Sequence, residues 1–238
     1  MTTDRRRWRG AQAAALGVGA AALLWSTIRG RGKLQKPEEL VSSACVLTAA
    51  LLAWRRDTLQ GDSGTTRRLA QGMACGLMGD LIMGRALPLP DSLYVPAGMV
   101  AFGAGHIAYL AALRNLAVRH DLRRRSHSIG ALAFSTIVAV SAWQRWVRND
   151  QRALLSYAAL GYGLLLATMA GMGLGLALEK RSLAPLAAGG ALFVVSDLVL
   201  GARLLRNLDF PGRDNAIWLS YILGQTLIVW TASREAEQ

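Results

Sequence analysis

The sequence predicts an all-α fold, a polytopic membrane bundle of about eight transmembrane helices. Two observations support this prediction. Apolar windows of about twenty residues with few charges recur along the 238-residue chain. The Lys and Arg residues, which give a net charge of +12, gather between those windows. Basic residues at the ends of apolar spans are typical of contact with anionic lipid headgroups, so the charge favours a lipid bilayer partner over nucleic acid.

The first four spans are defined by apolar windows and by the residues at their ends. Arg5–Arg7 precede the first window, and we interpret them as a cytoplasmic anchor rather than part of a cleaved signal peptide. Pro37 falls in the first turn of the second window, where its missing N–H would be unpaired in any helix. Pro88 and Pro90 end the third window. These spans are predicted at residues 10–28, 37–54, 68–87 and 92–113.

The last four spans follow a basic loop, Arg119–Arg125. The sixth is rich in Gly, which allows helices to approach closely in lipid. Six tryptophans lie near span ends, as an interfacial belt predicts: Trp25, Trp54, Trp143, Trp146, Trp218 and Trp230. These spans are predicted at residues 128–147, 153–178, 183–205 and 215–232, and all eight are expected to form one integral membrane domain, residues 1–238.

The distribution of basic residues predicts the orientation of the chain. The N-terminus, the even-numbered loops and the C-terminus together hold more of the 27 Lys and Arg residues than the odd-numbered loops do. This bias favours both termini in the cytoplasm. Cys45 and Cys75 both fall inside apolar spans, without the spacing of a metal or redox motif. We therefore expect no metal and no cofactor.

Two similar stretches, Gly79–Arg85 and Ser196–Arg203, each place an aspartate inside an apolar span: Asp80 and Asp197. An ionised carboxylate there costs about 2.5–3.5 kcal/mol on insertion scales. A structural role, bonding to a neighbouring helix or to the arginine that follows, stays open. If both aspartates face one cavity, their mutual repulsion keeps one protonated near neutral pH. A proton donor beside an anion suits acid-catalysed cleavage through a cationic transition state.

Polar residues in other spans are candidates for the same pocket. His106 and Tyr109, at positions i and i+3, share a helix face, and we interpret His106 as part of a functional pocket. Tyr221 and Gln225, at i and i+4, also share a face, where hydrogen bonding between helices is the alternative to substrate contact. Lys36, just before the second span, is either an ordinary interfacial lysine or a phosphate contact.

The spacing of these residues suggests a four-plus-four internal repeat. Asp197 lies four spans after Asp80, and each is followed in the next span by polar residues, His106 in one case and Tyr221 and Gln225 in the other. Four is an even number, so the two copies would share one orientation about an axis along the membrane normal. Chance similarity between apolar helices is the alternative.

With these landmarks the chain resembles the YhhN-type lysoplasmalogenase family, multi-span membrane proteins of bacteria and of animal endoplasmic reticulum. The resemblance rests on five stretches in order: Lys36-Pro37, Gly79-Asp80, Phe102–Tyr109, Gly190–Asp197 and Tyr221–Gln225. Two positions depart from the family pattern. Gly76 stands where the family often has Ser, and Ser220-Tyr221 replaces a pair of aromatic residues.

The resemblance implies hydrolysis of the vinyl ether bond of lysoplasmalogens to a fatty aldehyde and glycerophosphoethanolamine or glycerophosphocholine. It implies a bacterial cell membrane location, a lysophospholipid substrate, and Asp80 and Asp197 as the catalytic acid and anion. In this scheme Lys36 holds the phosphate, and the remaining substrate contacts are His106, Tyr109, Tyr221 and Gln225.

Two other function classes fit parts of the pattern. Intramembrane acids and internal repeats are also features of proton-coupled or small-molecule transporters. A non-catalytic membrane scaffold would need neither acid for chemistry. The headgroup preference, the assignment of acid and base to the two aspartates, and the oligomeric state are left open by the sequence.

Overall fold

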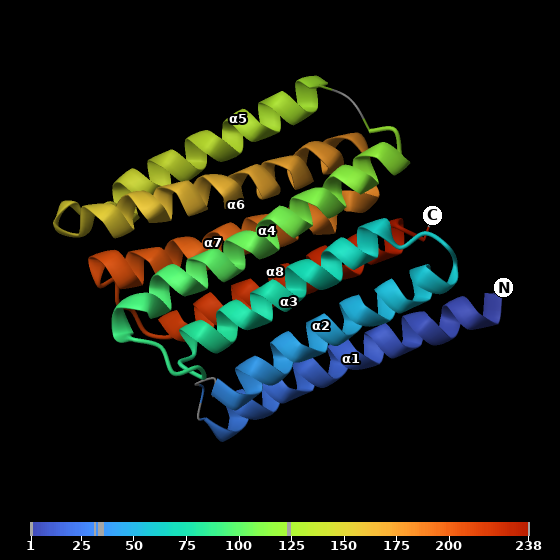
Figure 1. Cartoon of the computed structure of the whole chain (residues 1–238), viewed down its shortest axis with the longest axis horizontal. Coiled ribbons are helices and arrows are strands. Elements are labelled where there is room, and N and C mark those ends of the chain that lie inside the picture. The colour runs from blue at the N-terminus through green and yellow to red at the C-terminus, as the bar shows by residue number, and fades with distance from the viewer. Residues whose placement is uncertain (1, 31, 33–35, 123–124, 238) are drawn as a thin grey trace. The chain divides into compact units, whose positions relative to one another are not determined.

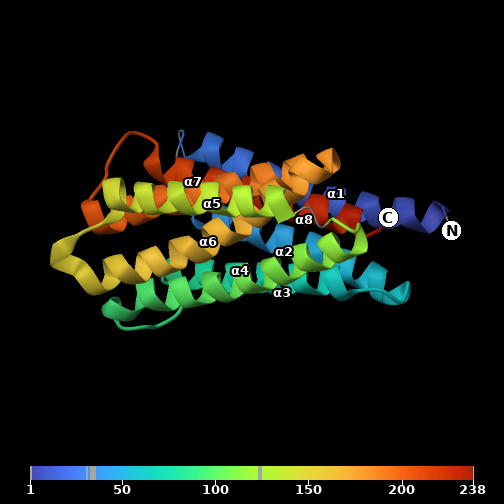
Figure 2. The same ribbon diagram turned by 90° about the horizontal axis from the view of Figure 1, so that it is seen from above.

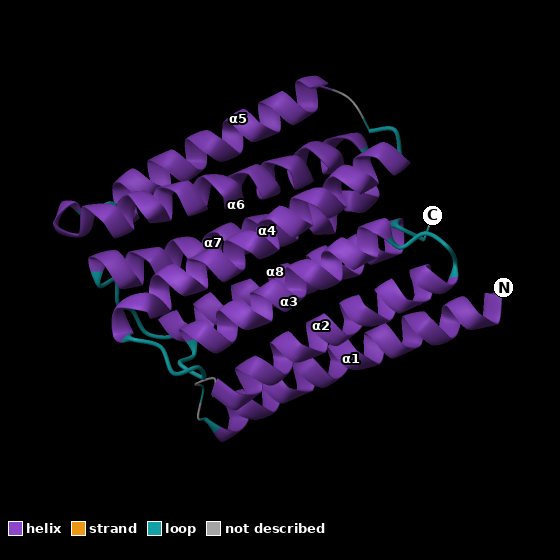
Figure 3. Cartoon of the chain, viewed as in Figure 1, coloured by secondary structure: helices purple, strands orange, loops and turns teal. Residues whose placement is uncertain are grey.

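The computed structural model describes residues 2–30, 32, 36–122 and 125–237, and within them the chain forms eight α-helices and no strand (Figure 1, Figure 3). The helices are α1 Thr2–Arg29, α2 Lys36–Leu59, α3 Gly64–Met83, α4 Tyr94–Arg119, α5 Arg125–Ala142, α6 Ala153–Glu179, α7 Ala184–Arg206 and α8 Arg213–Glu235. Five of them, α1, α4, α6, α7 and α8, are long and apolar enough to cross a membrane. The predicted all-α membrane bundle is therefore confirmed.

Helix α3 ends earlier than the sequence predicted. The third span was expected to reach residue 87, but the helix stops at Met83. The backbone N–H of Gly84 donates to the Asp80 carbonyl oxygen at 2.8 Å, and Arg85 adopts a left-handed φ of 59°. This turn closes the helix before the prolines are reached. As a result Asp80 lies in the last turn of α3, close to a helix end rather than deep within an apolar span.

Helix α5 continues into a single turn of π-helix, Trp143–Val147. The N–H of Arg148 closes this turn on the Trp143 carbonyl oxygen at 2.8 Å. The Trp143 ring is 8% exposed and its indole N–H donates to the Ser156 carbonyl oxygen at 2.8 Å. Trp143 therefore packs inside the bundle, whereas Trp146, 52% exposed, has the exposure expected of an interfacial residue.

The chain divides into two compact units. Unit 1 comprises Met1–Leu116 and Val229–Gln238, and unit 2 comprises Ala117–Ile228. In unit 1, α2 packs between α1 and α3, and in unit 2, α6 packs between α5 and α7. The successive helices of each unit thus pack in the same order. The prediction of a single integral domain stays a prediction.

Within each unit, the third and fourth helices cross where two glycines meet. In unit 1, α3 and α4 run side by side (Figure 1, Figure 2), and a Cβ on Gly105 would lie 2.9 Å from the Gly72 carbonyl oxygen. In unit 2, a Cβ on Gly224 would lie 2.8 Å from the Gly189 carbonyl oxygen. Any side chain at these crossings would force the helices apart.

The crossing glycines hold matching places relative to the polar residues. Gly72 and Gly189 each precede the aspartate of their helix by the same number of residues, and Gly105 and Gly224 directly precede His106 and Gln225. The two crossings therefore match in sequence position and in geometry. This match favours the predicted internal repeat over chance similarity.

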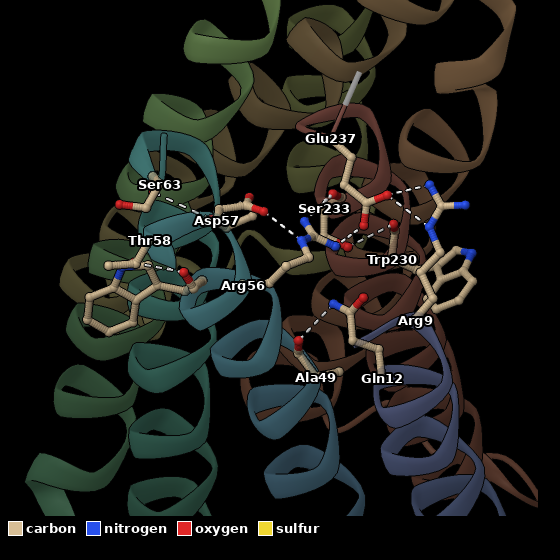
Figure 4. A network of polar contacts seen from close by, with 12 residues as sticks. Arg9, Gln12, Ala49, Arg56, Asp57, Thr58, Ser63, Trp230, Ser233 and Glu237 are labelled. Atoms are coloured by element: carbon tan, nitrogen blue, oxygen red, sulfur yellow. Dashed lines mark hydrogen bonds and ion pairs between the residues drawn. The ribbon is translucent and has the colours of Figure 1, made fainter. Parts of the chain in front are cut away.

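A buried ionic cluster joins three segments at one end of unit 1 (Figure 4). The Arg56 side chain is 0% exposed; it donates to Asp57 at 2.6 Å, to the Ser233 carbonyl oxygen at 3.0 Å and to the Glu237 carboxylate. Arg9 also donates to Glu237, with Nε at 2.8 Å. Buried charges persist only when paired, and here α1, α2 and the C-terminal residues supply the pairs.

Candidate active site

Asp80 lies buried between α3 and α2, 6% exposed. The hydroxyl of Ser43 on α2, itself 0% exposed, donates a hydrogen bond to Asp80 Oδ2. The arginine that follows in sequence, Arg85, forms its ion pair with Asp91 at 2.8 Å. The Asp80 carboxyl therefore accepts from a neutral hydroxyl of the neighbouring helix, and Arg85 pairs elsewhere.

Asp197 lies on α7 in unit 2, where it is partly buried. The phenol of Tyr162 on α6 donates a hydrogen bond to Asp197 Oδ2. Arg203, one of the arginines considered as a structural partner, pairs instead with Asp214 at 3.1 Å. The surroundings of Asp197 thus repeat those of Asp80: a carboxyl on the third helix of the unit accepts from a hydroxyl on the second helix.

The two hydroxyl partners, Ser43 and Tyr162, were missed in the sequence. Each had a visible signal, since a polar side chain in an apolar span needs a hydrogen-bond partner. Ser43 follows Ser42 within the second span, and Tyr162 lies between Gly161 and Gly163 in the sixth. The two glycines were interpreted as a sign of close helix packing, and no hydrogen-bond partner was predicted for the phenol between them.

His106 and Tyr109 both lie buried on α4, each 1% exposed, as their shared helix face predicted. The Tyr109 ring fills the space over Gly72, where a Cβ would lie 2.5 Å from ring carbon Cε1. Its hydroxyl donates to the Met73 sulfur at 3.6 Å. Tyr109 therefore also has a packing role, since it locks α4 onto α3 in unit 1.

Tyr221 and Gln225 lie buried on α8, 4% and 1% exposed. The Tyr221 ring packs edge-on against Phe193 of α7, with ring centroids 5.2 Å apart, and against Trp218 at 5.2 Å. Aromatic pairs in this geometry contribute about 0.5–1.5 kcal/mol beyond area burial. Tyr221 thus binds α8 to α7, the helix of Asp197.

Lys36 opens α2, seven residues before Ser43, or about 10.5 Å along the helix axis. Its side chain is 75% exposed, and its ammonium pairs with Glu39 at 2.9 Å. Lys36 therefore lies at the end of unit 1 where the Asp80–Ser43 pair is found, with its charge partly satisfied by Glu39.

The residues proposed from the sequence fall into two sets, one in each unit. Unit 1 holds Asp80, His106, Tyr109 and Lys36; unit 2 holds Asp197, Tyr221 and Gln225. The meeting of the two aspartates around one substrate stays a prediction. Among the residues that the structure describes, no group of three His, Cys, Asp or Glu side chains is arranged to hold a metal ion.

Comparison with known proteins identifies one family. The model of the YhhN family matches residues 38–232, most of the chain, including both aspartates and the four polar residues on α4 and α8. The match begins just after Lys36. It confirms the resemblance inferred from the motifs. No curated protein and no solved structure matches the chain.

Proposed function

Since the chain belongs to the YhhN family, we propose that it is a membrane hydrolase that cleaves the vinyl ether bond of lysoplasmalogens. The observation that supports this best is the pair of carboxyls, Asp80 and Asp197, each held by a hydroxyl from the neighbouring helix of its unit. Two acids maintained in similar apolar surroundings are suited to proton transfer. The products are a long-chain aldehyde and glycerophosphoethanolamine or glycerophosphocholine.

The reaction begins with a proton transfer to carbon. A protonated Asp donates its proton to the β-carbon of the vinyl ether, and the double bond's electrons form the new C–H bond. The oxocarbenium ion that results is stabilised by the second, ionised Asp, as carboxylates stabilise similar cations in glycosidases. That Asp then removes a proton from water as the water attacks. The hemiacetal collapses to the aldehyde and releases the glycerol hydroxyl, so one water is consumed overall.

The remaining residues have supporting roles in this proposal. Ser43 and Tyr162 orient the two carboxyls. General acid–base catalysis by positioned carboxyls raises the reaction rate about 10²–10⁴-fold. His106 and Gln225, in matching places on α4 and α8, orient the attacking water or the glycerol hydroxyl. Lys36 at the end of α2 binds the substrate phosphate, exchanging its contact with Glu39 for it.

Aldehyde release from purified protein tests the proposal. The protein in detergent is incubated with lysoplasmenylethanolamine and the aldehyde is trapped, for wild type, Asp80→Asn and Asp197→Asn. Asp91→Asn is the matched control, because its carboxylate is 81% exposed and lies outside the site. We expect both buried variants to lose at least 100-fold in rate and the control to keep its rate. An inert wild type refutes the activity, and full rates in both buried variants refute the mechanism.

A proton-coupled transporter is the second candidate, because the two units share one helix-packing order and one carboxyl–hydroxyl arrangement. Internal repeats with intramembrane acids are typical of transporters. Transport would couple solute uptake to a proton gradient in proteoliposomes. The hydrolase releases aldehyde in detergent, where no gradient exists, so the two assays separate the candidates.

The orientation of the chain is part of the proposal. We place both termini on the cytoplasmic side of a bacterial cell membrane, because the N-terminus, the even-numbered loops and the C-terminus together hold more Lys and Arg than the odd-numbered loops. Reporter fusions at the C-terminus test it. A reporter protein that works only in the cytoplasm should give a signal, and one that works only on the outer side of the membrane should give none.

A further inference from the structure

A polar cleft lies at one end of unit 2, and neither Asp80 nor Asp197 lines it. Its volume is about 320 Å³, and six polar or charged residues line it: Gln144, Arg148, Asn149, Asp150, Arg206 and Asn207. They come from the π-helical turn, from the segment that follows it, and from the end of α7. None of these residues belongs to the proposed catalytic set.

The cleft lies at the ends of two candidate membrane spans, where the boundary between membrane and water is expected. Two helical stretches of unit 2 border it, and both are apolar enough to span a membrane: one ends at Arg206 and the other begins at Asp150. Trp146, one turn from the cleft, is 52% exposed, as expected of an indole among lipid headgroups. Phosphate groups of the lipids are concentrated at this level.

The walls of the cleft are fixed by hydrogen bonds. Arg206 Nη1 donates to the Arg148 carbonyl oxygen at 2.9 Å, and Arg152 Nη1 donates to the Leu204 carbonyl oxygen at 3.1 Å. The Asn149 side chain donates to the Leu205 carbonyl oxygen. These bonds tie the end of α7 to the segment before α6. Two of them satisfy carbonyls in the last turn of α7, those of Leu204 and Leu205.

The charged groups of the cleft favour an anion. Arg148 Nε donates a hydrogen bond to the Asp150 carboxylate at 3.0 Å, and Arg206 Nη1 donates one to the Arg148 carbonyl oxygen. A guanidinium has five N–H donors, so both arginines retain donors in a geometry that matches phosphate oxygens. Two guanidiniums against one carboxylate leave a net positive charge, and the amides of Gln144 and Asn207 add neutral donors.

We propose that this cleft binds the phosphate of a phospholipid headgroup at the membrane surface. The occupant is a lipid, because the cleft lies where two apolar spans meet the interface and a lipid anchored in the bilayer presents its phosphate there. The proposal stands whether or not the chain is a hydrolase.

Lipid binding to the purified protein tests the proposal. Native mass spectrometry in detergent measures the affinity for dioleoyl phosphatidylglycerol in wild type and in the Arg148→Gln, Arg206→Gln double variant. The matched control is the Arg145→Gln, Arg181→Gln double variant, which removes the same charge at exposed positions outside the cleft. We expect a loss of roughly 25-fold in the cleft variant, at about a factor of five for each arginine, and little loss in the control.

Two outcomes overturn the proposal. Equal affinity of the cleft variant and wild type, or an equal loss in the control, shows that the cleft does not select the lipid. Displacement of the lipid by inorganic phosphate or glycerophosphate at equal concentration shows a site for free phosphate instead. Thermal unfolding of each variant is measured in parallel, and Arg148→Gln alone, with an expected loss of about five-fold, replaces the double variant if Arg206→Gln unfolds, because the Arg148 carbonyl still accepts from Arg206.

Discussion

Replacing Tyr162 by Phe removes one hydroxyl from the proposed site and leaves the ring in place. The hydroxyl donates to Asp197 Oδ2 in the interior of unit 2. A hydrogen bond to a charged group contributes about 1.5–3 kcal/mol, so its loss lowers the rate about 10- to 150-fold if Asp197 is ionised in the transition state. The same change at Tyr157, five residues earlier on α6 with its side chain 56% exposed, is the matched control.

The measurement separates a positioning role from a structural one. Aldehyde release is followed over a range of lysoplasmenylethanolamine concentrations, and thermal unfolding is followed in the same detergent. We expect kcat to fall for Tyr162→Phe with KM nearly unchanged, because the phenol acts on the carboxyl and not on the substrate. A normal kcat with a lower melting temperature would refute this reasoning and assign Tyr162 to the fold alone.

Three further perturbations test the packing and the proposed pairing. Gly189→Ala places a Cβ 2.8 Å from a backbone oxygen of α8, so it should lower the free energy of unfolding by about 1–3 kcal/mol in thermal or denaturant unfolding. Gly161→Ala is the control and should not destabilise the protein, because a Cβ there would meet nothing within 4 Å. Equal effects of the two changes would contradict the close crossing. Arg56→Met leaves two carboxylates without their buried cation and should cost about 3–5 kcal/mol of unfolding free energy, and an unchanged melting temperature would contradict the ion-pair cluster. Combining Asp80→Asn with Asp197→Asn should lower the rate of aldehyde release little further than either single change does, and losses that multiply would count against two acids acting as one unit.

The helices were predictable because each apolar window is bounded by charges or prolines. The pairing of side chains was not, since it depends on how each helix is rotated about its axis. Asp80 was singled out by its cost in lipid, but nothing in its own stretch identified Ser43 on another helix as its donor. The second span was predicted to end at residue 54, where the apolar window ends, but α2 continues to Leu59 and includes Arg56. The structure buries this side chain, because Glu237, far along the sequence, supplies the compensating charge.

For Trp143 as well, the local sequence pattern did not predict which way the side chain faces. Its position at the end of a span predicted an interfacial side chain, as did that of Trp146. The π-helical turn changes the direction of successive side chains, so one indole faces the interior and bonds to Ser156 while the other is exposed. A π-helical turn does not change the hydropathy pattern, so the sequence alone does not reveal it.

The matched carboxyl–hydroxyl pairs have a consequence for ancestry. If the two halves descend from one four-helix sequence, the ancestral protein had to assemble as a dimer of identical halves, with the same alcohol beside each acid. Fusion of two such copies into one chain would have removed that constraint. One copy now presents an aliphatic alcohol, Ser43, and the other a more acidic phenol, Tyr162. In that case, two acids in matching places have come to accept from chemically different hydroxyls, although the acid is an aspartate in both halves.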